Sequence, residues 1–230
     1  MVTFARKNAI LIGILFILGT AFGILSGSFL NPSLGTSDFL IKIAENQSQV
    51  SIGGLLILLM GLACSAIGPA LYPVLKKFSP GLAMGSVSFR LIEGMLEILL
   101  AMIIFLLVAA GRSLTLAGMQ NLAAFEPIAS VLKAGMDWLN NGAMLIPWCI
   151  AAFMYYWIFY QHNLLPRWIS IWGFIGIGFS MVSTTLNFIN PDFVQYQFIF
   201  SLPIFFQELF MAGWMIVKGF NPVKNTQIQG

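Results

Sequence analysis

Long apolar runs alternate with short polar segments along the whole chain, and this pattern predicts a helical membrane protein. A helix needs about 20 apolar residues to cross the roughly 30 Å hydrocarbon core of a bilayer. Six runs reach that length, at approximately residues 9–30, 50–75, 82–110, 142–160, 168–189 and 198–217. We therefore expect an all-α, polytopic transmembrane helix bundle of six spans, forming a single domain over residues 1–230.

The composition agrees with this pattern and excludes other classes of protein. Hydrophobic residues make up 59% of the chain and charged residues only 8%, against about 25% charged residues in an ordinary soluble domain. The formal net charge is +3, but the basic residues are scattered at the ends of apolar runs and form no basic face. We therefore expect no nucleic-acid partner. The lipid bilayer is the partner that the sequence predicts.

The charges between the apolar runs predict the orientation, because short segments rich in Lys and Arg stay in the cytoplasm. With a cytoplasmic N-terminus, the inner segments carry basic residues and no acidic ones: Arg6, Lys7, Lys76, Lys77, Arg167, Lys218 and Lys224. The outer segments mix fewer basic residues with acidic ones: Lys42, Arg112, Lys133, Asp38, Glu45, Glu126, Asp137 and Asp192. We expect both termini in the cytoplasm.

Two outer segments, residues 37–49 and 128–140, have apolar residues at helical spacing. They predict short helices at the membrane surface, with a lid or a partner-binding surface as the alternative to a plain connector. The aromatic run "FMYYWIFY" at the end of the fourth span predicts rings at the headgroup level.

Small residues recur in two spans, and in lipid such residues let helix backbones approach each other. They predict packing seams in the first and fifth spans, at Gly19, Gly23, Gly27, Gly173, Gly176 and Gly178. Approach of a ligand over bare backbone is the alternative interpretation.

The stretch "SFRLIEGMLE" places three ionisable side chains inside the third span. A rise of 1.5 Å per residue, counted from the start of that span, puts Arg90, Glu93 and Glu97 roughly 12, 16 and 22 Å deep. Their spacing places them on one helix face, which must face the protein interior. In the sixth span, beside Gln207, the same count puts Glu208 roughly 15 Å deep. The two spans are predicted to share one polar centre.

This polar centre carries more negative than positive charge. An Arg or Asp at mid-membrane costs about 2.5–3.5 kcal/mol, so four unpaired groups would cost on the order of 10 kcal/mol. One arginine cannot neutralise three glutamates. Either some glutamates are protonated, since burial favours the neutral carboxyl, or a cation or cationic ligand lies among them. A purely structural ion pair, with the remaining carboxyls protonated, is the alternative.

The sequence lacks the residues of familiar membrane enzymes. A single histidine, His162, excludes a three-histidine zinc site and a bis-histidine haem within one chain. Cys64 and Cys149 lie in apolar runs without CxxC spacing or nearby histidines, so neither a metal site nor a disulfide is expected. No cofactor and no catalytic residue is assigned. Acid–base chemistry by Glu93 and Glu208 is the remaining enzymatic option.

Several segments together resemble one family. "GTAFGILSGSFL", "LYPVLKKFSPGLAMGSVSFRLIEGMLE", "LLPRWISIWG" and "LPIFFQELFMAGWMIVKGFNP" are similar, in order, to a bacterial integral membrane family catalogued as domain of unknown function 4386. The resemblance implies a bacterial plasma-membrane protein of about six helices. It supports Arg90, Glu93, Gln207 and Glu208 as the core of the site, and it implies no reaction or substrate.

The function that we expect is binding or transport of a proton, a cation or a small amphiphile at a buried Arg/Glu cluster. Its candidate residues are Arg90, Glu93, Glu97, Gln207 and Glu208. A membrane scaffold or regulatory subunit, in which the cluster only fixes helix packing, is the second hypothesis. An intramembrane enzyme with paired carboxylates is the third.

Overall fold

The computed structural model describes residues 4–222, which form helices and no strand. Six of its helical stretches are long and apolar enough to cross a membrane, which confirms the predicted six-span bundle. The elements are α1 (Phe4–Leu34), α2 (Phe39–Glu45), α3 (Gln47–Leu75), α4 (Pro80–Ala117), η1 (Met119–Asn121), α5 (Leu122–Trp138), η2 (Leu139–Ala143), α6 (Leu145–His162), α7 (Arg167–Ile189), η3 (Pro191–Phe193) and α8 (Val194–Val217).

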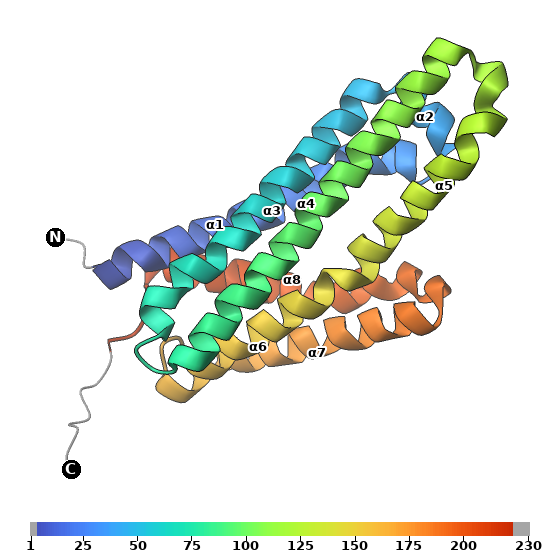
Figure 1. Ribbon diagram of the computed structural model, residues 1–230. Helices are drawn as coiled ribbons and strands as arrows, with labels where there is room; N and C mark the ends of the chain where they lie inside the picture. The colour runs from blue at the N-terminus through green and yellow to red at the C-terminus, as the bar shows by residue number, and fades with distance from the viewer. Residues whose placement is uncertain (1–3, 223–230) are drawn as a thin grey trace.

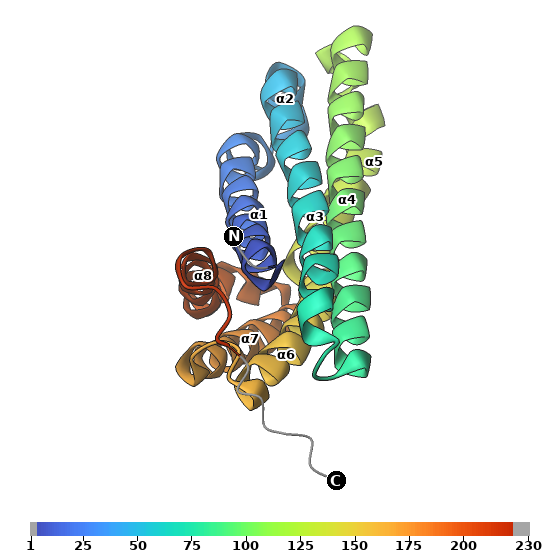
Figure 2. The same cartoon turned by 90° about the vertical axis from the view of Figure 1, so that its left-hand side faces the viewer.

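The six long helices close into a ring. α1 packs on α3, α3 on α4, α4 on α6, α6 on α7 and α7 on α8, and α8 returns to α1. Figures 1 and 2 show α1, α3 and α4 on one side of the molecule and α6, α7 and α8 on the other. Short connections make most neighbours antiparallel. The ring therefore encloses a single interior, to which every long helix contributes one face.

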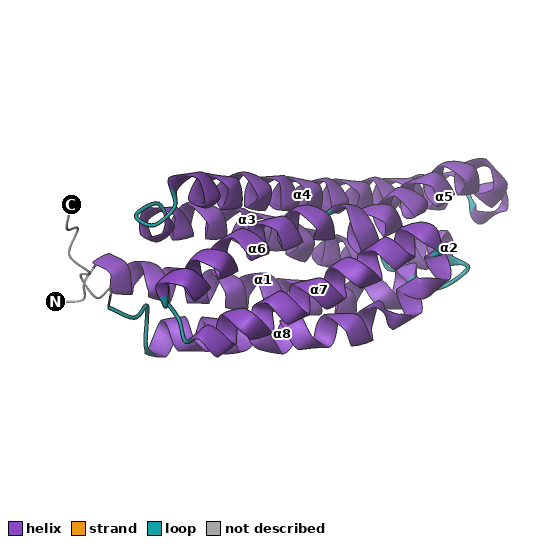
Figure 3. Cartoon of the chain, turned by 90° about the horizontal axis from the view of Figure 1, so that it is seen from below, coloured by secondary structure: helices purple, strands orange, loops and turns teal. Residues whose placement is uncertain are grey.

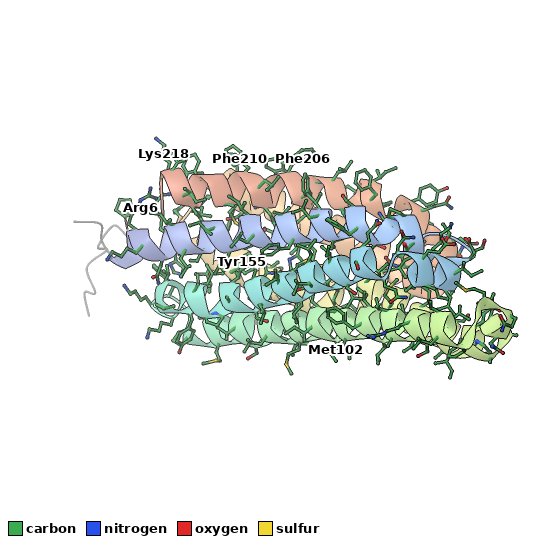
Figure 4. The ribbon with its side chains drawn as sticks, turned by 90° about the horizontal axis from the view of Figure 1, so that it is seen from above. Arg6, Met102, Tyr155, Phe206, Phe210 and Lys218 are labelled. Carbon is green, nitrogen blue, oxygen red and sulfur yellow. The ribbon has the colours of Figure 1, made fainter. Side chains whose placement is uncertain are left out.

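Apolar side chains cover the outside of this ring as well as its inside. Met102, Phe206 and Phe210 are 52%, 54% and 43% exposed and point away from the helices, whereas Tyr155 lies between them (Figure 4). A surface of exposed large apolar residues is unfavourable in water and is the surface that lipid tails require. The chain is therefore a multi-pass membrane protein, and a set of its polar side chains, including Arg90, Glu93 and Glu97, is buried inside.

Residues 128–140 are helical, as predicted, but they do not form a separate short helix. This segment belongs to α5 and to η2, a π-helical turn that joins α5 to α6, so that residues 119–162 form one helical stretch. Asn140, Asn141 and Gly142 lie in η2, where an inserted π turn shifts the helix register without ending it. α5 runs back along α4 (Figure 3). The other outer segment does contain a short helix, α2, which packs on α4 and α1.

The predicted glycine seams are present in part. A Cβ atom on Gly19 would lie 3.3 Å from Cys64 Sγ, and one on Gly23 would lie 3.0 Å from Met60 Sδ, so both glycines face α3. Gly27 meets no neighbouring helix within 4 Å. In α7, Gly173 packs under the ring of Tyr156 and Gly176 against Ile204 of α8, but Gly178 faces open space in the described structure.

Arg6 links the start of α1 to the end of α8 through hydrogen bonds. Its guanidinium donates to the carbonyl oxygens of Met215 (2.8 Å), Ile216 and Val217 (3.0 Å), and Figure 4 shows it beside Lys218. The last carbonyls of a helix have no hydrogen-bond donor within that helix. Arg6 provides the donors for the last carbonyls of α8. The start of α1 and the end of α8 thus lie at the same end of the bundle.

Replacing Arg6 with alanine is expected to lower the free energy of unfolding by about 1–2 kcal/mol, because charged hydrogen bonds to the α8 carbonyls are lost. Thermal unfolding in mild detergent measures the change. Lys7, the exposed neighbour of Arg6, provides the matched control, and Lys7→Ala should have little effect. Equal effects of the two substitutions would contradict the role of Arg6.

Candidate functional site

One face of α4 carries the ionisable residues into the interior. Arg90, Glu93 and Glu97 are 1%, 4% and 3% exposed, although α4 has lipid-facing residues on its other side. Spacings of three and four residues bring these side chains to the same face. The charged residues of the third span therefore lie where the sequence places them, inside the ring.

Arg90 is the centre of the cluster. Its Nη1 atom donates to both carboxylate oxygens of Glu93, at 3.0 and 3.1 Å, and its Nη2 atom donates to the Tyr155 hydroxyl at 2.8 Å. The guanidinium also lies over the rings of Phe16 and Tyr155, 5.3 and 5.5 Å from their centroids, as cation–π contacts require. Arg90 thereby connects α4 to α1 and to α6.

Glu208 of α8 lies within ion-pair distance of this cluster but beyond hydrogen-bonding range. Its Oε1 atom is 3.8 Å from Arg90 Nη2, beyond the 2.7–2.9 Å of a charge-assisted hydrogen bond. Within the described residues, Oε1 has no hydrogen-bond partner, and the side chain is 16% exposed. The predicted meeting of the third and sixth spans occurs, but Arg90 compensates Glu93 much better than it compensates Glu208.

Glu97 has a different neighbour, Cys64 of α3. One oxygen of Glu97, one oxygen of Glu93 and Cys64 Sγ all lie within 4.8 Å of one another. Glu97 Oε2 has no hydrogen-bond partner among residues 4–222. α3 and α4 approach closely here, because Gly61 and Gly94 pack backbone against backbone. These three side chains are the group within the cluster that has the donor atoms for a metal ion.

Gln207 belongs to a second, neighbouring network. Its Oε1 atom accepts from the Tyr156 hydroxyl at 2.7 Å, and its Nε2 atom donates to the Ile169 carbonyl at 3.0 Å. The rings of Tyr155 and Tyr156 lie edge to face with centroids 4.6 Å apart. Gln207 therefore ties α6, α7 and α8 together beside the cluster and does not bind Arg90.

The expectation that the aromatic run lies at the headgroup level is wrong for Tyr155 and Tyr156. Both are fully buried and hydrogen-bonded in the interior. A count of residues would have indicated this, because Tyr155 precedes the predicted span end by five residues, or roughly 8 Å. Cys64 and Phe16 carried no comparable signal, since an isolated Cys or Phe in an apolar run resembles any core residue.

Two cavities lie on the side of the cluster away from the chain ends. One, of about 330 Å³, is lined by residues of α1, α3, α4 and α5, including Met60 and Leu100. These two residues are one helical turn from Cys64 and Glu97. The other cavity, of about 470 Å³, lies between α5, η2 and α7. The ion pair of Lys133 and Asp137, with nitrogen and oxygen 2.7 Å apart, lines both.

The fold and the cluster define a class: a multi-pass helical membrane protein with ionisable residues enclosed among its helices. The chain belongs to the family described as "Domain of unknown function (DUF4386)", whose pattern matches residues 11–219. This membership confirms the resemblance seen in the sequence. Neither the curated proteins nor the solved structures contain a match to the chain.

Proposed function

We propose that the protein binds a proton or a small cation at the cluster of Arg90, Glu93, Glu97 and Glu208, as a transporter or a membrane receptor. The observation that carries this proposal is the imbalance of the cluster. Arg90 makes close contacts with Glu93 alone among the carboxylates, and Glu97 and Glu208 each retain an oxygen without a partner in the described structure.

A cation accounts for this imbalance better than a small amphiphile does. One arginine and three ionised glutamates carry a formal charge of −2, and an uncompensated buried charge is strongly unfavourable. A bound positive charge removes that penalty, whereas an apolar tail does nothing for it. The 330 Å³ cavity, one helical turn from Glu97, supports access to the cluster from that side.

We place the protein in a bacterial plasma membrane with both termini in the cytoplasm. The bacterial assignment is the one that the sequence resemblance implies. The orientation is supported by the basic residues around the chain ends, where Arg6 and Lys218 lie together (Figure 4) and where the positive-inside rule expects them. Lys224, which also entered that count, lies outside the described residues.

Native mass spectrometry of gently solubilised protein tests the proposal. Wild type should retain a small ligand or ion, and Glu97→Gln and Glu208→Gln should each release it, because either change removes a carboxylate that compensates the cation. Glu45→Gln is the matched control, since Glu45 is exposed and, among the described residues, pairs with Lys42 at 3.2 Å. A retained mass that is unchanged in both interior variants would contradict the proposed site.

Binding of protons leaves no retained mass, so a second assay is needed. Proteoliposomes with a pH-sensitive dye inside should show proton movement that Glu208→Gln abolishes. If neither assay distinguishes wild type from the variants, transport and ligand binding are both excluded.

A structural role is the second candidate, and one observation favours it. Arg90 contacts Phe16, Glu93 and Tyr155, and so holds three helices together without any ligand. A scaffold of this kind predicts that Glu208→Gln changes stability or assembly with a partner while every ligand assay stays empty.

A further inference from the structure

We propose that Cys64, Glu93 and Glu97 form a binding site for a divalent transition-metal ion of the zinc type. This inference rests on the proposed function and names the cation that the cluster binds. The three donor atoms come from two helices, α3 and α4, and lie within 4.8 Å of one another. This site is not indicated by the residue pattern alone, because Cys64 is far from both glutamates along the chain.

The distances suit a metal ion after a small adjustment. Zinc binds thiolate sulfur at about 2.3 Å and carboxylate oxygen at about 2.0–2.2 Å, which separates the donors of a tetrahedral site by roughly 3.3–3.8 Å. The donors here must therefore approach by little more than about 1 Å. Rotation of the Glu97 side chain, whose Oε2 atom makes no hydrogen bond in the described structure, supplies such a shift, while the glycine contacts of α3 and α4 fix the backbones.

An independent observation points to a missing partner at this position. Glu97 is 3% exposed, yet its Oε2 atom has no hydrogen bond to any described residue. Polar atoms buried to this degree are almost always bonded. Arg90 does not supply this bond in the described structure, because its hydrogen bonds go to Glu93 and Tyr155 and its Nε atom is itself without a partner there.

The donor types define the class of ion. A thiol beside carboxylates disfavours Mg²⁺ and Ca²⁺, which take oxygen ligands, and suits Zn²⁺ and its spectroscopic substitute Co²⁺. A dication also cancels the formal charge of −2 on the four ionised side chains. When the thiol loses its proton on binding, Glu208 is the neighbouring carboxylate that can accept one.

Cobalt titration of the purified full-length chain in detergent tests the site. Co²⁺ should give the sulfur-to-metal charge-transfer band of a thiolate complex, and the protein should retain about one equivalent of Zn²⁺ after desalting. Cys64→Ser should lose the band and most of the retained zinc, and Glu97→Gln should weaken binding by about tenfold or more.

Cys149→Ser is the matched control. Cys149 is buried as Cys64 is, but its thiol contacts the Ile177 carbonyl, with sulfur and oxygen 3.8 Å apart. The Cys149→Ser variant should keep the charge-transfer band and the retained zinc. If wild type retains no more metal than Cys64→Ser, or if Cys149→Ser loses as much, the inference is overturned. If size-exclusion chromatography shows that Cys64→Ser does not fold, the site is tested with Glu97→Gln alone.

The outcomes separate this inference from the proposed function. Proton movement that depends on Glu208, in a protein that binds neither metal, overturns the metal site and leaves proton transport standing. Metal retained through Cys64, in a protein that moves no protons, supports the site and excludes proton transport.

Discussion

Replacing Arg90 with alanine is expected to lower the free energy of unfolding by about 3–5 kcal/mol, the usual effect of removing one partner of a buried ion pair. The substitution leaves Glu93, which is 4% exposed, without its counter-charge. It also removes the donor to the Tyr155 hydroxyl and the cation over the Phe16 ring. Thermal or denaturant unfolding in mild detergent measures the loss.

Two further variants show whether the ion pair causes the effect. Arg112→Ala removes an arginine from an exposed position of the same helix and should change stability by less than about 0.5 kcal/mol. Arg90→Met combined with Glu93→Leu removes both charges at similar volume and should recover much of the stability. If the double variant is no more stable than Arg90→Ala, the pairing energy is not what Arg90 contributes.

Gly94→Ala is expected to destabilise the protein by about 1–3 kcal/mol, the usual range for overpacking. A Cβ atom on Gly94 would lie 1.9 Å from Ser65 Oγ and 2.6 Å from the Gly61 carbonyl oxygen. The serine side chain can rotate away, but the Gly61 oxygen belongs to the backbone of α3, so the two helices must separate. The same separation moves Cys64 from Glu97 and should reduce metal retention.

Gly178→Ala is the control for the glycine substitution. A Cβ atom there meets nothing within 4 Å in the described structure. Alanine also has the higher helix propensity, so this variant should be as stable as wild type or slightly more stable. Loss of stability in both variants would mean that glycine itself, and not the contact of α3 with α4, determines the effect.

The fold was predictable because membrane spans are encoded locally. Twenty apolar residues in sequence suffice to identify a span, and the six predicted spans all correspond to long helices. The interior face of α4 was equally predictable, since a charge in lipid must turn inward and helical spacing then determines which residues share its face. Burial of Arg90, Glu93 and Glu97 follows from these two rules alone.

The remaining features of the fold and the site depend on contacts between residues that are distant in the sequence. Asn140 and Asn141 occupy a π turn within a continuous helical stretch, and this turn packs on α4 and α7, where Asn187 donates to the Asn141 carbonyl at 3.3 Å. Gln207 was expected in the charged cluster but bonds to Tyr156 instead. The rotation of α4 about its axis was predictable from its three charges, whereas the rotation of α6 and α8 was not. That rotation decides which polar groups meet.

Tyr155 and Tyr156 are consecutive residues of α6 and therefore project about 100° apart around its axis. One donates to Gln207, and the other accepts from Arg90. Both rings are carried by one rigid helix, so α6 cannot turn to release Arg90 without also withdrawing Tyr156 from Gln207. The hydrogen bond to α4 and the hydrogen bond to α8 therefore share one helix, and a rotation of α6 about its axis would change both.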